Sequence, residues 1–286
     1  MGRNVEDVLL NYVKEDMGFG DVTTDLVLGD RYGCEARGCI IAKEACTVAG
    51  LEVAGILFSM LGCDVSGLVA DGDRVAAGNR VLLVSGPVES LLLGERTALN
   101  VISRMSGVAT MTGQAIEKAR AVNPAVRISA TRKTTPGFEL FEKMAVLIAG
   151  GDTHRMNLSE SVLIKDNHVT LVGSAVEAVK LARDGASFVK KIEVEVGTYE
   201  EAMECATAGP DIIMLDNFSP WEASRTYKDL KAKYPGILIE VSGGIGPDNV
   251  DEYAGDADVI SMGGLTHSYR SVDFTMVLES EDGGSS

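Results

Sequence analysis

The segment between residues 130 and 168 is rich in side chains that can bind an anion. These side chains are Arg132, Lys133, His154, Arg155 and Lys165. Five such groups in one cavity would repel one another unless an anion of high charge lay between them. A planar guanidinium group matches a carboxylate with two parallel hydrogen bonds, so the set predicts a pocket for a small dicarboxylate. The alternative is a solvated surface where these cations pair with Glu142, Asp152 and Asp166. Surface ion pairs would explain any one of the cations, but they explain the whole set less well.

Two consecutive glycine turns predict a phosphate site. They read SGGIGPDN (242 to 249) and MGGLTHS (262 to 268), and they carry hydroxyl groups at Ser242, Thr266 and Ser268. Glycine lets backbone N–H groups approach a phosphate closely, and a helix that follows the turn adds the positive end of its dipole. A single glycine pair is often needed only for the geometry of a turn. The prediction of a phosphate site therefore rests on the presence of two such turns after consecutive strands.

Carboxylates stand between these two groups of residues in the sequence. Glu193 and Glu195 share one face of a candidate strand, and Asp216 ends the next strand. Carboxylates beside a phosphate site usually hold Mg²⁺, and they can stabilise positive charge that develops on a sugar ring. For Glu193 we expect an ion pair with Lys190 or Lys191 instead. The cations, the glycine turns and the carboxylates together indicate a transferase that joins an anionic ring to a phosphorylated sugar.

These residues lie at the ends of six candidate strands that alternate with helical segments. The strands are residues 126–131, 161–165, 191–196, 211–216, 237–242 and 257–262. Repeated βα units predict a parallel sheet. Nearly every strand ends in polar residues or glycine, and a ring of such residues at the carboxyl ends of the strands is typical of α/β barrels. We therefore expect an α/β barrel in the second part of the chain.

The first part of the chain has a different pattern. We expect an amphipathic helix at residues 4–16, and strands and tight turns from 34 to 88 with one helix near 51–62. Residues 89–121 are predicted to be helical, with a break at Gly107. The two parts are therefore expected to be separate domains.

Composition excludes several classes of protein. The chain has 286 residues, 45% of them hydrophobic, and a formal net charge of −16. So acidic a protein is not expected to bind nucleic acid, and no apolar run reaches the ~18 residues of a membrane span. The acidic, amphipathic start does not resemble a signal peptide, and five cysteines without a CxxC pair suit free thiols in the cytoplasm. Three histidines, none at a zinc-site spacing from a cysteine pair, make a structural zinc unexpected.

A series of motifs along nearly the whole chain resembles one family. The motifs are EDMGFGDVTTD (15 to 25), ERTALN (95 to 100), SGVAT (106 to 110), TRKTTPG (131 to 137), GGDTHR (150 to 155), LIKDNH (163 to 168), EVEV (193 to 196), MLDN (214 to 217), SGGI (242 to 245) and GGLTHS (263 to 268). In this order they are similar to the quinolinate phosphoribosyltransferase family, also called nicotinate-nucleotide pyrophosphorylase (carboxylating). The resemblance implies transfer of phosphoribosyl from phosphoribosyl pyrophosphate to quinolinate, with release of pyrophosphate and CO₂, in NAD biosynthesis.

The resemblance also implies an architecture. It implies an N-terminal open α/β sandwich at residues 1–112 and an incomplete parallel α/β barrel at residues 113–269. After these we expect a C-terminal helix and a disordered tail in residues 270–286, since the last residues are polar, acidic and glycine-rich. The family pattern further implies a homodimer in which each active site is shared between two subunits. Such dimers can also assemble into a higher oligomer.

Residue roles follow from the resemblance position by position. The quinolinate carboxylates are assigned to Arg132, Lys133, His154, Arg155 and Lys165, with Arg96 supplied by the other subunit. Mg²⁺ and the ribose are assigned to Glu195 and Asp216, which with Lys133 form the expected catalytic set. The sugar 5-phosphate is assigned to Ser242, Gly243, Gly244, Gly263 and His267. One departure is Ala130, where an Asp is common, and it places in doubt a hydrogen bond that orients the arginine loop.

Two alternatives remain open from the sequence. A barrel protein associated with molybdenum transport is similar to this family, but it is expected to lack the second Thr of TRKTT and the LIKDNH motif, both of which are intact here. A Schiff-base aldolase that uses Lys165 would need a lysine with a lowered pKa. That second alternative leaves the glycine turns and the carboxylates only partly explained.

Overall fold

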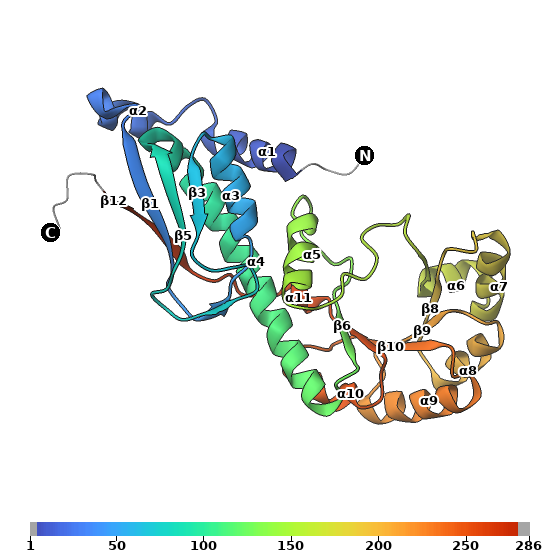
Figure 1. Ribbon diagram of the computed structural model, residues 1–286. Helices are drawn as coiled ribbons and strands as arrows, with labels where there is room; N and C mark the ends of the chain where they lie inside the picture. Colours follow the sequence, from blue (N-terminus) through green and yellow to red (C-terminus); the bar gives the residue numbers. More distant parts are fainter. Residues whose placement is uncertain (1–4, 280–286) are drawn as a thin grey trace. The chain divides into compact units, whose positions relative to one another are not determined.

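The computed structural model describes residues 5–279, and they form two compact units (Figure 1). One unit runs to Thr110 and takes in the segment that begins at Arg270. The other unit comprises Met111–Tyr269. Among the described helices, none combines the length and the apolar character that crossing a bilayer requires.

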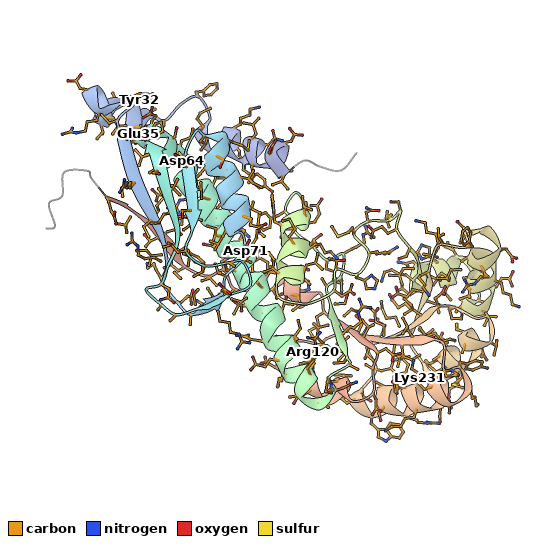
Figure 2. The ribbon with its side chains drawn as sticks, in the orientation of Figure 1. Tyr32, Glu35, Asp64, Asp71, Arg120 and Lys231 are labelled. Carbon is orange, nitrogen blue, oxygen red and sulfur yellow. The ribbon has the colours of Figure 1, made fainter. Side chains whose placement is uncertain are left out.

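The first unit is a layer of helices against an antiparallel sheet (Figure 1). The sheet has the order β12-β1-β5-β3, with β1 at Glu35–Ala42, β3 at Asp64–Gly67, β5 at Arg80–Pro87 and β12 at Phe274–Glu279. The helices are α1 (Val5–Met17), α2 (Val22–Leu28), α3 (Leu51–Met60) and the first part of α4 (Val88–Val122), which continues into the second unit. Two short strands, β2 (Cys46–Thr47) and β4 (Arg74–Val75), pair with each other. Asp71 accepts the Leu51 N–H at 2.9 Å and so caps the start of α3 (Figure 2).

The predicted break at Gly107 is wrong, because α4 continues through it from Val88 to Val122. A glycine inside a helix costs only about 1 kcal/mol relative to alanine. Here the neighbouring residues hold the helix in place: Met105 and Val108 are fully buried, and the Ser106 hydroxyl accepts the Ala49 N–H at 3.0 Å. Packing of this face therefore outweighs the local preference of glycine.

The predicted C-terminal helix is also wrong, because residues 274–279 form strand β12. This strand pairs antiparallel with β1, with Met276 opposite Ile40. Its side chains alternate, and Phe274 and Met276 are buried while Thr275 between them is more exposed. An alternation of period two buries one face of a strand, which a helix of the same residues would not do. Residues 280–286 of the expected tail lie outside the described residues.

The second unit contains the predicted six-stranded parallel sheet, which curves as an incomplete barrel with the order β6-β11-β10-β9-β8-β7. The strands are β6 (Arg127–Ser129), β7 (Val162–Ile164), β8 (Ile192–Val196), β9 (Ile212–Asp216), β10 (Leu238–Ser242) and β11 (Val259–Ser261). The helices are α5 (Glu139–Ile148), α6 (Asp166–Val172), α7 (Ala175–Gly185), α8 (Tyr199–Thr207), α9 (Pro220–Lys233), α10 (Asp251–Ala254) and α11 (Gly264–His267). Asp152 extends the sheet beyond β6 through a parallel bridge to Ser129.

Strand alternation separates the core of this unit from its functional face. Val194, Ile213 and Val241 are fully buried in the core, which also includes residues of the surrounding helices such as Ala202 and Leu230. The residues between them in each strand point to the opposite face. That face carries Glu193, Glu195, Met214, Asp216, Glu240 and Ser242. The parallel strands therefore present all of these side chains on one side of the sheet.

The five cysteines are free thiols, as expected. Four are buried, and Cys34 is exposed. Burial raises the pKa of Cys46 and of Cys205 to about 11. These two thiols therefore stay protonated near neutral pH and do not serve as nucleophiles.

Candidate active site

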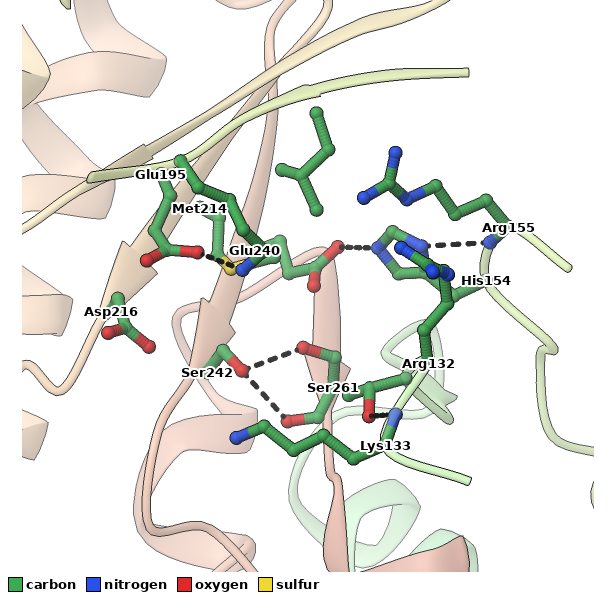
Figure 3. Close-up of a pocket in the computed structure, with 13 residues that line it drawn as sticks. Arg132, Lys133, His154, Arg155, Glu195, Met214, Asp216, Glu240, Ser242 and Ser261 are labelled. Atoms are coloured by element: carbon green, nitrogen blue, oxygen red, sulfur yellow. Dashed lines mark hydrogen bonds and ion pairs between the residues drawn. The ribbon is translucent and has the colours of Figure 1, made fainter. Parts of the chain in front are cut away.

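A pocket of about 300 Å³ lies at the carboxyl ends of the barrel strands (Figure 3). It is lined by Thr131, Arg132, Lys133, His154, Arg155, Leu163, Lys165, Glu195, Met214, Asp216, Glu240, Ser242 and Ser261. Five of the six strands contribute residues directly, and β6 contributes through the loop that follows it, which carries Thr131, Arg132 and Lys133. The pocket thus unites the predicted cations with both predicted metal carboxylates and with Ser242.

The arginine loop after β6 is held by hydrogen bonds to its own residues and to a glycine turn. The Thr131 hydroxyl accepts the Lys133 N–H at 3.0 Å. The Thr266 hydroxyl donates to the Lys133 carbonyl at 2.9 Å, which joins this loop to the second glycine turn. Ala130 is buried, and its N–H donates to the Asp152 carbonyl at 2.8 Å. The loop is therefore anchored without the Asp that is common at position 130.

Nε2 of His154 lies close to two buried carboxylates, Glu193 and Glu240, of which Figure 3 shows Glu240. Its Nε2 is 3.4 Å from Glu193 and 3.3 Å from Glu240, and its Nδ1 accepts the Arg155 N–H at 2.8 Å. Burial lowers the pKa of His154, but the hydrogen bonds and charges of both carboxylates raise it more. The two carboxylates therefore favour a proton on Nε2, whereas the Arg155 N–H opposes a second proton on Nδ1. A metal ion on Nε2 would have to displace that proton, although the three side chains are close enough to surround one.

This arrangement changes the interpretation of two predicted residues. Both ring nitrogens of His154 are already engaged, so direct contact with a substrate carboxylate would need one of these partners to be released. The predicted pairing of Glu193 with Lys190 or Lys191 is wrong. Lys191 pairs with Asp211 at 3.2 Å, whereas Glu193 is 1% exposed and points toward His154. Burial raises the pKa of Glu193, and the nearby charge of Glu240 adds to this effect.

Glu195 and Asp216 carry the kind of oxygen ligands that a hard divalent cation prefers. They lie at the carboxyl ends of neighbouring strands, and both line the main pocket and an adjoining pocket of about 290 Å³. Lys165 donates to Glu195 at 2.5 Å, and the Asn217 amide donates to Asp216 at 2.6 Å. Carboxylate oxygens with open space beside them suit Mg²⁺, which keeps several water or phosphate ligands. The residues present therefore fit the expected ion.

The two glycine turns adjoin this pocket. At Gly243, with φ of 95°, a Cβ atom would lie 2.3 Å from the Asn217 amide oxygen, so only glycine fits there. At Gly263 a Cβ would lie 2.9 Å from both His267 and Lys133, which places these three residues in direct proximity. Helices α10 and α11 have four residues each, so backbone N–H groups rather than helix dipoles must provide most of any phosphate binding.

The remaining predicted residues lie outside the pocket wall. Gly243, Gly244, Gly263 and His267 belong to the adjoining turns, and of the expected phosphate ligands Ser242 alone is among the lining residues. Arg96 lies on α4 in the first unit and is exposed. Its part in substrate binding remains a prediction.

Sequence reasoning missed several residues of the site. Glu240, Ser261 and Met214 line the pocket, and the Ser261 hydroxyl donates to that of Ser242 at 2.9 Å. Glu240 stands two residues before Ser242 in β10, so strict alternation along the strand was a signal that would have found it.

Comparison with known proteins adds independent evidence. The description "Quinolinate phosphoribosyl transferase, C-terminal domain" matches residues 108–277, and the N-terminal domain of the same description matches residues 21–106. The chain belongs to the quinolinate phosphoribosyl transferase family. The two matched segments together include every residue that lines the pocket.

Relatives in the quinolinate phosphoribosyl transferase family cover almost the full chain. A probable nicotinate-nucleotide pyrophosphorylase [carboxylating] of Methanothermobacter thermautotrophicus is 43% identical over 95% of this chain and 98% of its own. The Homo sapiens nicotinate-nucleotide pyrophosphorylase [carboxylating] is 41% identical over 85% of this chain and 82% of its own. The crystal structure of NadC from Streptococcus pyogenes is 38% identical, with a TM-score of 0.89, and covers 98% of this chain and 99% of that chain. These likenesses extend over both units of the fold.

Proposed function

We propose that this protein is a quinolinate phosphoribosyltransferase that forms nicotinate mononucleotide, pyrophosphate and CO₂ from quinolinate and phosphoribosyl pyrophosphate in NAD biosynthesis. The observation that carries the proposal is the composition of one pocket. Arg132, Lys133 and Arg155 provide positive charge, while Glu195 and Asp216 provide carboxylates, and the glycine turns adjoin them. A dianionic ring and a phosphorylated sugar need these complementary features side by side.

In the proposed reaction the cationic side chains bind the two carboxylates of quinolinate and orient its ring nitrogen toward C1 of the ribose. Glu195 and Asp216 face the positive charge that develops on the sugar ring as pyrophosphate departs. Mg²⁺, when bound by these two carboxylates, would neutralise charge on the leaving pyrophosphate. The new N–C bond makes the ring nitrogen positive, so when the bond to the C2 carboxylate breaks and CO₂ leaves, the electron pair stays on C2 as a carbanion stabilised by the adjacent positive nitrogen. We assign to Lys133 the proton that then reaches C2.

The two alternatives are less favoured by the site. Lys165 donates to Glu195 at 2.5 Å, so its amino group is already engaged by a carboxylate, whereas a Schiff-base lysine must present a free amino group to a carbonyl. The second Thr of the final TT pair in TRKTT is present as Thr135, and its N–H donates to Glu142 at 3.0 Å. Lys165 of the LIKDNH motif lines the pocket, and Thr135 lies in the arginine loop, so both features expected to be lost in the molybdenum-associated relative are present here.

Substrate choice tests the proposed function. The enzyme is expected to use quinolinate with a kcat/KM far above that for nicotinate. Nicotinate has a single carboxylate, so it would leave some of the cations in the pocket without a partner. Initial rates of nucleotide formation from each acid, at saturating phosphoribosyl pyrophosphate and Mg²⁺, measure the ratio. Comparable values for the two acids would count against the assignment.

Metal removal tests the roles of Glu195 and Asp216. EDTA is expected to abolish turnover and added Mg²⁺ to restore it, since the metal is assigned to the pyrophosphate. Binding of quinolinate alone, measured by calorimetry, is expected to persist in EDTA, because cationic side chains hold that ligand. Full turnover in a metal-stripped sample would contradict the metal role.

We further propose a homodimer in which Arg96 of one subunit completes the pocket of the other. An exposed arginine on α4 is available for such a contact. The reaction is placed in the cytoplasm, a compartment in which five free thiols stay reduced.

A further inference from the structure

Helix α5 carries two neighbouring charged residues that are buried. Glu142 is 0% exposed and Lys143 is 2% exposed, and neither is among the residues that line the pocket. Burial of a charged group costs several kcal/mol unless partners compensate it. Apolar side chains at these two positions would pack into the core without that cost, so the charged pair needs another explanation.

Each of the two residues holds one of the loops that carry the cations. Glu142 accepts the Thr135 N–H at 3.0 Å, and Thr135 follows Arg132 and Lys133 in the arginine loop. The Lys143 ammonium donates to the carbonyl of Thr153, the residue directly before His154 and Arg155. One turn of one helix therefore fixes the backbone of both loops.

The loop after α5 is tightly packed, which leaves its backbone little freedom to take another conformation. At Gly151 a Cβ atom would lie 2.8 Å from Val146 on α5 and 2.9 Å from Thr112. The Asp152 N–H donates to the Ile128 carbonyl at 2.8 Å, which ties the same loop to β6. With its carbonyl at Thr153 held by Lys143, the segment from Gly151 to Arg155 has anchors on both sides.

Lys143 also adds positive charge behind the wall of the pocket. The charged groups that face it are Arg132, Glu142, Asp152 and Glu160. Burial lowers the pKa of Lys143 to about 8, while the three carboxylates act in the opposite direction. A bound dianion would favour the charged ammonium, because opposite charges nearby stabilise the protonated form.

We propose that Glu142 and Lys143 are positioning residues for the dicarboxylate. They hold the arginine loop and the loop before Arg155 in the relative placement that a ring with two carboxylates requires, and the Lys143 ammonium strengthens the binding of that dianion. The inference rests on the proposed function, since it concerns how quinolinate is bound.

Steady-state kinetics of four variants test the positioning role. Lys143→Met and Glu142→Leu are expected to raise the KM for quinolinate by about ten-fold or more, as when a buried hydrogen bond to a charged group is lost. The KM for phosphoribosyl pyrophosphate should change by less than about two-fold. Glu142→Gln should recover most of the loss, because its amide oxygen can still accept the Thr135 N–H. Lys180→Met, which removes an exposed lysine on α7, is the matched control and should behave as wild type.

The pH dependence of quinolinate binding tests the charge of Lys143. Since the dianion raises the pKa of Lys143 above about 8, affinity should be highest below pH 8 and fall as the pH rises through that value. Carboxylic acids and guanidinium groups ordinarily titrate far from pH 8. Calorimetry between pH 6.5 and 8.5, below the raised pKa of His154, should therefore show the fall in wild type and a much smaller change in Lys143→Met.

The outcomes separate this inference from the proposed function. A wild-type enzyme that does not convert quinolinate would overturn the function itself. An active enzyme whose quinolinate KM is unchanged in Lys143→Met and Glu142→Leu, or changes equally for both substrates, would overturn the positioning role alone. If Lys143→Met does not fold, the wild-type pH profile and the comparison of Glu142→Gln with Glu142→Leu test the positioning role instead. A flat wild-type profile, or equal quinolinate KM values in the two Glu142 variants, would count against that role.

Discussion

Replacing Arg132 by alanine is expected to raise the KM for quinolinate by roughly 30-fold or more while the KM for phosphoribosyl pyrophosphate changes little. Loss of a hydrogen bond between a guanidinium group and a bound carboxylate costs about 1.5–3 kcal/mol, because the carboxylate is left without that partner. Arg132 lines the cationic side of the pocket, opposite the carboxylates assigned to the sugar and the metal. Initial rates with each substrate varied in turn give both KM values.

A matched control is Arg225→Ala. Arg225 is an exposed arginine on α9 that stacks over the ring of Tyr199 at 4.3 Å and is not among the pocket residues. Its replacement should leave both KM values unchanged. Equal losses for the two substrates in Arg132→Ala would place Arg132 elsewhere than against the quinolinate carboxylates.

Mixing two inactive variants is expected to restore activity if the active sites are shared between subunits. Arg96→Ala and Glu195→Ala should each be nearly inactive as pure proteins. In a two-fold dimer the same contact is made twice, so a mixed dimer holds one doubly damaged site and one intact site. Random pairing makes about half of the dimers mixed, and half of their sites are intact, so recovery should approach roughly a quarter of wild-type activity.

The control for this experiment mixes Glu195→Ala with Asp216→Ala. Both residues line the same barrel pocket, so every site of that mixed dimer keeps one damaged barrel and no activity should return. Size-exclusion chromatography of differently tagged variants shows whether subunits have exchanged. Exchange without recovered activity in the Arg96 mixture would remove Arg96 from the partner's active site.

The barrel and its functional face were accessible from the sequence because both depend on local patterns. Each predicted strand contains the observed one, for example Ile192–Val196 within residues 191–196. In parallel strands the carboxyl ends meet at one edge, so polar residues at those ends predicted a common site without knowledge of the strand order. The convergence of Arg132, Lys165 and Asp216 in one pocket follows from this rule.

What escaped prediction depends on contacts between distant parts of the chain. Strand β12 is stabilised by pairing with β1, more than two hundred residues earlier, as in the register Phe274 opposite Ala42. Alternation along β10 places Glu240 on the functional face, but its partner His154, 3.3 Å away, comes from another loop. The role of Glu142 and Lys143 likewise depends on the two loops that they reach. No local pattern contains such partners.

The most direct test of the proposed reaction follows the carboxylate beside the ring nitrogen. Quinolinate labelled in its C2 carboxylate is incubated with the protein, phosphoribosyl pyrophosphate and Mg²⁺, and labelled CO₂ and nicotinate mononucleotide are both measured. We expect one labelled CO₂ for each nucleotide formed, and neither product when phosphoribosyl pyrophosphate is omitted. Label retained in the nucleotide, or no product above the control without protein, would contradict decarboxylating phosphoribosyl transfer.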